Sequence, residues 1–262
     1  MAKIAPGQAF HADAFDAPVI GIAADMGEHD SGRHCHRRHQ LLFAAGGCIT
    51  IELADTLCLL PPSRAAWIPA GTLHRALMRG VVAYRSLYFR ADLPFPAPPL
   101  QVFEVNPLLR EAIERMAFWP WEMAEERQAS LLAVFGEELL AARGENWRLP
   151  FPTDPRLASW LNSLRHGGLP PRLGQLADKA GACERTLSRI FVKETGMSYQ
   201  AWRQQWRLLK AMELLAEGAS AGEAAQRLEF ASDSAFIAFF RQHAGETPAR
   251  YARDRDQSSV SR

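Results

Sequence analysis

The second half of the chain contains an internal repeat, and this repeat constrains the fold more than any other feature. Leu176-Ala177 and Ala180 match Ala224-Ala225 and Leu228 at an offset of 48 residues, and one extra residue in the following turn makes the offset 49. Each copy has the pattern of a helix, a short turn, a second helix, and a glycine followed by a hydroxyl residue. This pattern predicts two helix-turn-helix units. The later matching pairs are Leu187 with Phe236, Phe191 with Phe240, Gly196 with Gly245, Ser198 with Thr247 and Trp202 with Tyr251.

The first half has a different pattern, in which short apolar runs are separated by glycine and proline. Such runs predict the strands of a small antiparallel sandwich or barrel. A proline-dense stretch over 94–99 ends the sheet, since proline cannot donate to a strand ladder. The expected strands are Val19–Ala23, Gln40–Ala44, Cys48–Leu53, Ala65–Ile68, Leu73–Met78 and Val81–Phe89.

Two stretches that follow the sheet, Pro107–Trp119 and Glu125–Ala142, have the apolar spacing of helices. Their apolar stripes must be covered, either by the sheet of the same chain or by a second copy. The expected fold class is therefore a two-domain α+β protein, all-β at its N-terminus and all-α at its C-terminus. The expected boundaries are 1–99 for the β domain, 100–147 for a helical connector, 148–155 for a linker, 156–253 for the helical domain and 254–262 for a flexible tail.

The two halves also differ in charge. Residues 1–152 hold 14 basic and 17 acidic residues, net −3, whereas residues 153–262 hold 16 basic and 12 acidic residues, net +4. An acidic half joined to a mildly basic half is typical of a sensor attached to a nucleic-acid reader. No uncharged apolar run approaches the roughly 18 residues that cross a bilayer, and the N-terminus has no basic-then-apolar signal pattern. We therefore expect a cytoplasmic protein with no membrane partner.

The repeat places a defined set of residues where double-stranded DNA would lie. The second helix of a helix-turn-helix unit packs its apolar face on the first helix and places its polar face in the major groove. Arginine can bind guanine O6 and N7 together, so the first copy is expected to contribute more specificity than the second, which has fewer cations. An ordinary helical bundle with solvated charges is the alternative that charge alone leaves open. The expected DNA contacts are Glu184, Arg185, Ser188 and Arg189 in the first copy, and Ser232, Asp233, Ser234, Ile237, Ala238 and Arg241 in the second.

A longer string of residues carries a family resemblance. It consists of Leu176-Ala177, 181–191, 194–198, the long helix Trp202–Glu217, Phe230, Ser232, Phe236, Phe239-Phe240-Arg241 and 245–251. With both repeats in order, the chain resembles the AraC family of transcription regulators. The resemblance implies sequence-specific DNA binding by two recognition helices that reach major-groove faces about 34 Å apart. Two positions depart from the family, because Cys183 replaces a usual capping serine and Ala238 replaces a frequent basic or polar reader.

The first half carries a second pair of motifs. They are the run His34-Cys35-His36-Arg37-Arg38-His39-Gln40 followed by Gly47, and the run Pro69-Ala70-Gly71-Thr72-Leu73-His74. These runs resemble the two cupin motifs, with Gln40 in place of the usual glutamate, and the resemblance implies a cupin-like barrel. On a strand, side chains alternate, so His34, His36 and Gln40 share one face, while Cys35 and His39 share the other. If the first face points inward, His74 joins it.

Three imidazoles and one amide oxygen suit a divalent transition metal such as Zn, Ni, Fe or Cu. The neutral Gln40 removes a ligand charge and would weaken the site relative to that of a cupin enzyme. The alternative is a metal-free cupin in which these residues bind a small effector or fill the barrel. The candidate effector contacts near the same strands are Arg64, Trp67, Arg75 and Tyr88, although tryptophan is commonly a core residue.

These features together predict a transcription regulator whose barrel holds a small-molecule or metal effector. Its expected partners are promoter DNA, a second copy of the chain and, if it activates transcription, RNA polymerase. A metallo-cupin enzyme, such as a dioxygenase, fused to a DNA-binding module is the alternative. Gln40 argues against the enzyme, and no catalytic residues are predicted. A cupin that serves only as a dimerisation scaffold is a third hypothesis.

Overall fold

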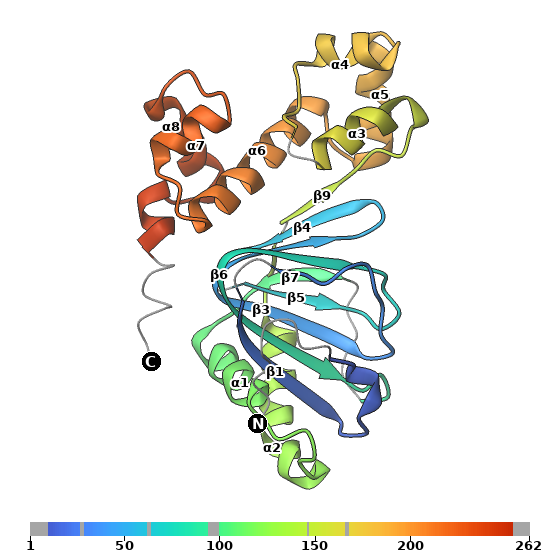
Figure 1. Ribbon diagram of the computed structural model, residues 1–262, viewed down its shortest axis with the longest axis vertical. Helices are drawn as coiled ribbons and strands as arrows, with labels where there is room; N and C mark the ends of the chain where they lie inside the picture. The colour runs from blue at the N-terminus through green and yellow to red at the C-terminus, as the bar shows by residue number, and fades with distance from the viewer. Residues whose placement is uncertain are drawn as a thin grey trace. The chain divides into compact units, whose positions relative to one another are not determined.

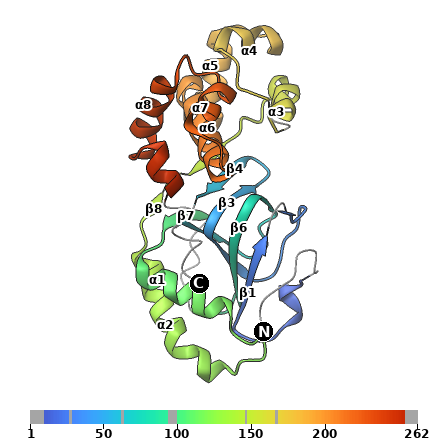
Figure 2. The same ribbon diagram turned by 60° about the vertical axis from the view of Figure 1, so that its left-hand side comes forward.

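The computed structural model describes residues 10–26, 29–61, 64–93, 100–145, 147–165 and 168–253, which fall into two compact units (Figures 1 and 2). Within these residues, the first unit contains 10–52, 59–147 and 252–253, and the second contains 53–58 and 148–251. The predicted proline-dense border at 94–99 and the predicted tail at 254–262 lie outside the described residues. In the described ranges, no helix has both the length and the apolar character that a membrane span requires.

The first unit is built on an antiparallel sheet, which confirms the predicted all-β domain. The strands run in the order β1-β6-β3-β5-β7-β8, and β2 also pairs with β6. A short 3-10 helix, η1 (Ala12–Ala14), precedes them. The strands are β1 (Val19–Met26), β2 (His29–Asp30), β3 (His39–Glu52), β5 (Arg64–Ile68), β6 (Arg75–Phe89), β7 (Gln101–Glu104) and β8 (Gly144–Glu145).

Two strands are longer than the sequence pattern predicted, because β3 and β6 each run through a position that was expected to be a turn. In the pairing of β3 with β6, the register shifts between Ala44 and Gly46 and again between Gly46 and Cys48. Such shifts mark a β-bulge, which bends a strand without ending it. Gly47 has a φ of 80°, a conformation that glycine adopts without steric cost. The glycine pair therefore bends β3 instead of closing a hairpin.

The two connector helices cover the outer face of this sheet. They are α1 (Pro107–Ala117) and α2 (Glu125–Ala141), close to the predicted ranges, and both lie along the same side of the sheet in Figures 1 and 2. Ile113 and Phe135 are fully buried in one cluster with Leu41 and Leu87 of the sheet. Most of the apolar stripe is therefore covered by the chain's own sheet. Three apolar side chains of these helices stay exposed, Leu108 at 53%, Val134 at 37% and Leu140 at 65%.

The second unit is helical, as predicted, and contains two consecutive helix-turn-helix units. The second helix of each unit is α5 (Glu184–Thr195) or α8 (Asp233–Ala244). Each ends at a glycine with a left-handed backbone, Gly196 at φ 72° and Gly245 at φ 79°. The matching ring pairs also have matching spacing, with centroids 5.5 Å apart for Phe191 and Trp202 and 5.6 Å apart for Phe240 and Tyr251. The helices are η2 (Pro155–Leu157), α3 (Ala158–Arg165), α4 (Leu173–Ala180), α5 (Glu184–Thr195), α6 (Tyr199–Ala216), α7 (Ala221–Arg227) and α8 (Asp233–Ala244).

The predicted linker at 148–155 contains a strand instead of an unpaired connection. This strand, β9 (Arg148–Pro150), pairs with β4 (Thr56–Leu60), so that Leu149 lies opposite Leu57. The pairing continues past β9, where the Phe151 amide donates to the Asp55 carbonyl at 2.7 Å. The Trp202 indole N–H in α6 donates to the Pro150 carbonyl at 2.6 Å. Residues 53–58, which the sequence pattern assigned to the β domain, thus form part of the second unit.

Truncation of Phe135 tests the packing of α2 on the sheet. Phe135 is fully buried and stacks on Phe89 with ring centroids 5.0 Å apart. We expect Phe135→Ala to lower the free energy of unfolding by about 3–5 kcal/mol, because it leaves a cavity in the core. Urea-induced unfolding measures this change. The control Glu137→Ala removes an exposed side chain from the same helix and should change the value by less than about 0.5 kcal/mol. Equal effects of the two substitutions would contradict the packing described.

Candidate functional site

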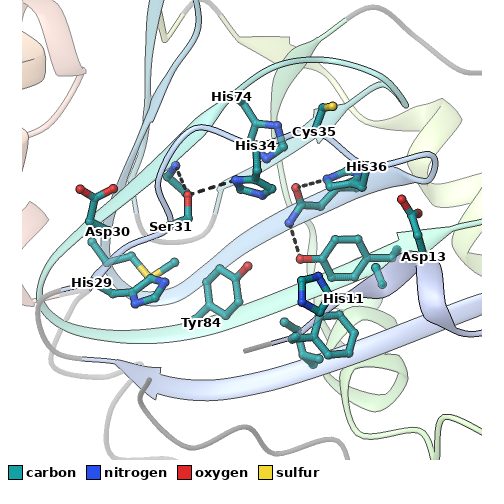
Figure 3. A pocket seen from close by; sticks show the side chains of 17 residues that line it. His11, Asp13, His29, Asp30, Ser31, His34, Cys35, His36, His74 and Tyr84 are labelled. Atoms are coloured by element: carbon teal, nitrogen blue, oxygen red, sulfur yellow. Dashed lines mark hydrogen bonds between the residues drawn. The ribbon is translucent and has the colours of Figure 1, made fainter. Parts of the chain in front are cut away.

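A cavity of about 380 Å³ opens inside the sheet of the first unit (Figure 3). Its volume lies in the range of roughly 300–1,000 Å³ that is usual for small-molecule sites. The lining side chains come from η1 and the two residues before it, from β2 and the segment between β2 and β3, from His74, and from β1, β3 and β6. Those that matter most for its chemistry are His34, His36, Gln40, His74, Tyr84 and Tyr88.

The cavity brings together the three histidines that the sequence motifs singled out. His34 and His74 form an isolated antiparallel bridge, with backbone N···O distances of 2.9 and 3.0 Å. One ring nitrogen from each of His34, His36 and His74 lies within 4.8 Å of the other two. The sequence analysis placed His34 and His36 on one face of a strand together with Gln40, and this was partly wrong. Both histidines precede β3, which begins at His39, and do not belong to a regular strand. Cys35, expected on the opposite face, also borders the cavity.

Hydrogen bonds orient all three imidazoles in the same way. In each ring, Nδ1 contacts a backbone carbonyl oxygen, which can only accept, so Nδ1 carries the proton. The neutral ring then has a lone pair on Nε2. Histidines that bind metals commonly donate their second ring nitrogen in this manner. The acceptors of His34, His36 and His74 are the carbonyls of Gly32, Arg38 and Thr72, at 3.1, 2.6 and 2.9 Å.

His74 is the most deeply buried of the three, with 1% of its surface exposed. Burial lowers the pKa of His74 from its ordinary value of 6.5 to about 4, and the neighbouring His34 and His36 lower it further. Its Nε2 has no hydrogen-bond partner among the described residues. At neutral pH this side chain therefore presents an unprotonated and unsatisfied nitrogen.

Gln40 connects the histidines to the cavity wall. Its side-chain nitrogen donates to Ser86 Oγ and to Tyr88 Oη, both at 2.9 Å, and its Oε1 lies 3.0 Å from His36 Nε2. A cation shared by the two atoms, a proton on Nε2 that is donated to Oε1, or a reversed amide in which the Gln40 nitrogen donates to His36 would each satisfy this contact. The position is thus compatible with a weak fourth ligand.

Of the four predicted effector contacts, Tyr88 alone lines the cavity. Trp67 is fully buried in the core between sheet and helices, where it stacks on His39 with ring centroids 5.4 Å apart. Arg64 pairs with Glu145 of β8 at 2.7 Å. Arg75 pairs with Asp30 at 2.6 Å and with Glu52 at 3.2 Å. For these three the prediction of a pocket position was wrong, because core packing and ion pairs hold their side chains elsewhere.

Several lining residues were missed by the sequence analysis. Tyr84 could have been found, since Tyr84, Ser86 and Tyr88 alternate along β6 and so share a face. Asp13 of η1 and His11, the residue before this helix, also line the cavity. The backbone N–H of Arg37 donates to the Asp13 carboxylate at 3.0 and 3.1 Å. These residues are 24 positions apart, so local sequence patterns could not predict the contact.

The predicted DNA contacts lie on the outer faces of the two recognition helices. In α5, Leu187, Ile190 and Phe191 are buried, as expected for the face that packs on α4. All ten predicted contacts are exposed except Ser188, which is half-buried. Ser232 uses its side-chain oxygen to accept from the Ala235 amide at 3.2 Å, which caps α8. Cys183 precedes α5 without such a bond, and its Sγ contacts Thr186 Oγ1 at 3.2 Å.

Comparison with known proteins assigns both units. The model of an AraC-like ligand binding domain matches residues 16–140, and that of a helix-turn-helix domain matches residues 176–254. The HTH-type transcriptional regulator NimR of Escherichia coli (strain K12) is 32% identical over 237 residues, which cover 90% of this chain and 87% of NimR. The chain belongs to the AraC family of transcription regulators.

Other proteins are similar to a smaller part of this AraC-family regulator. The HTH-type transcriptional regulator RipA of Corynebacterium glutamicum is 38% identical over 79 residues, 30% of this chain and 24% of RipA. The DNA-binding domain of AdpA, solved in complex with a target DNA, is 30% identical and covers 42% of this chain and 100% of its own, with a TM-score of 0.37. As predicted, this AraC-family regulator combines a ligand-binding domain with a helix-turn-helix domain.

The lowered pKa of His74 predicts a pH-dependent stability in the metal-free protein. The unfolded chain binds a proton at His74 near pH 6.5, whereas the folded chain binds it only near pH 4. The free energy of unfolding should therefore fall as pH drops from about 6.5 to 4, by up to about 1.4 kcal/mol per pH unit. Urea titrations with a chelator present, at several pH values, measure the slope. His74→Gln should have a shallower slope in this window, and equal slopes would refute the assignment.

Substitution in α5 tests whether its arginines contact bases. Arg185→Ala and Arg189→Ala should each lose about 1–3 kcal/mol of binding free energy and relax the preference at one base pair, if each arginine binds a guanine. Binding to a panel of single-base operator variants measures both effects. A loss that is uniform across sequences, together with a shallower dependence on salt, would show contacts to phosphates instead.

Proposed function

We propose that this AraC-type regulator senses a divalent transition metal, or a small effector held by that metal, in the cavity of its first unit. Zn, Ni, Fe and Cu are the candidate ions, because imidazole nitrogens suit all four. The observation that carries the proposal is the arrangement of three imidazoles, each with Nδ1 bonded to a backbone carbonyl and with one ring nitrogen within 4.8 Å of the other two. The buried Nε2 of His74, which has no partner among the described residues, fits the same group.

The ligands would be Nε2 of His34, His36 and His74, with Oε1 of Gln40 as a weaker fourth ligand. A bound ion would supply the positive charge that the lining side chains lack. No lysine or arginine is found among the described residues that line the cavity. Its two carboxylates are engaged, since Asp13 accepts from the Arg37 amide and Asp30 pairs with Arg75. An anionic effector would therefore be held through the metal rather than by a cationic side chain.

Occupancy of the cavity would act on transcription by changing the affinity of the DNA-binding unit for promoter DNA. A ligand shifts such an equilibrium only if it binds one state of the regulator more tightly than the other. We propose a homodimer as the DNA-bound form. The exposed apolar side chains Leu108, Val134 and Leu140 support a surface on the connector helices that a second copy covers. RNA polymerase would be a further partner if the regulator activates transcription.

Metal analysis of protein purified without a histidine tag tests this proposal. We expect near-stoichiometric metal in the wild-type protein and its loss in the double variant His36→Ala/His74→Ala. His243→Ala, which removes a histidine from α8 in the other unit, is the control and should retain the metal. Circular dichroism shows whether each variant is folded.

Reconstitution with metal and an assay for turnover distinguish the alternatives. If the folded wild-type protein takes up none of the four metals on reconstitution, the metal is excluded and an organic effector of a metal-free cavity becomes the preferred hypothesis. DNA binding by the second unit would be unaffected by that result. Metal-dependent turnover of a small substrate would instead support the metallo-cupin enzyme.

A further inference from the structure

The outer face of α8 presents two aliphatic side chains where a recognition helix is usually polar. Ser234, Ile237 and Ala238 are all exposed, and Ile237 leaves 38% of its surface in contact with solvent. The opposite face of the same helix is anchored by Phe236 and Phe240, which are fully buried. Ile237 thus lies outside the fully buried face of the helix and presents part of its apolar side chain to solvent.

The internal repeat identifies the surface to which Ile237 belongs. At the offset of 49 residues, Ser234, Ile237 and Ala238 of α8 take the places of Arg185, Ser188 and Arg189 of α5. Both helices have 12 residues and both end at a left-handed glycine, so the correspondence holds position by position. The apolar patch of α8 therefore occupies the same surface that α5 uses to present its two arginines.

Charged groups do not dominate this surface of α8. Asp233 lies beside α7, because its Oδ2 is 3.1 Å from the point that a Cβ on Gly222 would occupy. In the first copy, Oε1 of Glu184 likewise lies 2.8 Å from the point that a Cβ on Gly174 of α4 would occupy. The first two turns of α8 contain no cation, and Arg241 follows only in the third turn. The groove-facing chemistry of α8 is thus one hydroxyl group and two aliphatic side chains.

The major groove offers one apolar group that such side chains can recognise, the C5 methyl group of thymine. We propose that Ile237 and Ala238 contact thymine methyl groups, so that A·T pairs define the half-site under α8 while G·C pairs define the half-site under α5. The proposal rests on the DNA-binding function of the second unit and is independent of what the cavity binds. It assigns the two copies of the repeat to two different kinds of base recognition.

Replacing thymine by deoxyuridine tests the proposal, since deoxyuridine keeps every hydrogen-bonding group of thymine and lacks only the methyl group. Operator sequences would first be selected from a random duplex pool with the full-length protein, both metal-free and metal-loaded. The half-site whose preference relaxes with Arg185→Ala lies under α5, and the other lies under α8. We expect deoxyuridine in the α8 half-site to weaken binding about four-fold for each contacted methyl group, and to have no such effect in the α5 half-site.

Variants at one position link the effect to the side chain. Ile237→Ala should bind the thymine operator more weakly and lose its sensitivity to deoxyuridine at one position, whereas Ile237→Val should retain that sensitivity. Val192→Ala is the matched control, because Val192 is a β-branched residue of α5 with 56% of its surface exposed. It should leave the deoxyuridine response of the α8 half-site unchanged.

Two results would overturn the proposal. Equal affinity for thymine and deoxyuridine in the α8 half-site, with normal DNA binding by Ile237→Ala, would exclude methyl recognition. If that variant also altered transcription from the selected operator in a purified system, Ile237 would contact RNA polymerase instead. Failure to enrich any sequence with either form of the protein would refute sequence-specific binding itself, which is a separate outcome from the loss of the methyl effect.

Discussion

The antiparallel pairing of β3 with β6 determines where the other parts of the first unit lie. Side chains alternate along both strands, so the pair Gln40 and Tyr88 faces the cavity while the next pair, Leu41 and Leu87, faces α1 and α2. One ladder therefore builds the ligand site on one face and the hydrophobic core on the other. A register slip of a single residue would exchange the two faces, placing leucines in the cavity and a glutamine under the helices. The apolar core and the polar cavity thus fix each other's position.

The features that could be predicted from the sequence are those that local spacing encodes. The helical period predicted α1 nearly at its observed bounds, and the structure adds a cap at Asn106, whose side-chain oxygen accepts from the Leu109 amide at 2.8 Å. The repeat predicted both helix-turn-helix units because the same core positions recur. The histidine cluster was predicted from motif spacing, although its geometry comes from the bridge between His34 and His74 and not from a continuous strand.

The features that could not be predicted depend on partners far away in the chain. Arg64 is held by Glu145, 81 residues later, so its proximity to the motif strands said nothing about where its side chain would point. The bulge at Gly47 was indistinguishable from a turn, because glycine suits both conformations. The strand β9 has only 3 residues, too few for any period to show. Its structure comes from its pairing with β4 and from the hydrogen bond that Trp202 of α6 donates to Pro150.

The pairing of β4 with β9 decides where the chain can be cut. A fragment that starts at residue 148 would contain every described helix of the second unit and yet lack Leu53–Cys58, which belongs to the same unit. Leu149, fully buried in the intact chain, would lose the neighbour that faces it, and β9 would become an open edge ready to pair with other chains. A chimaera that joins this second unit to a different sensor therefore has to include β4 or a replacement for it, although 87 residues of sequence separate the two strands.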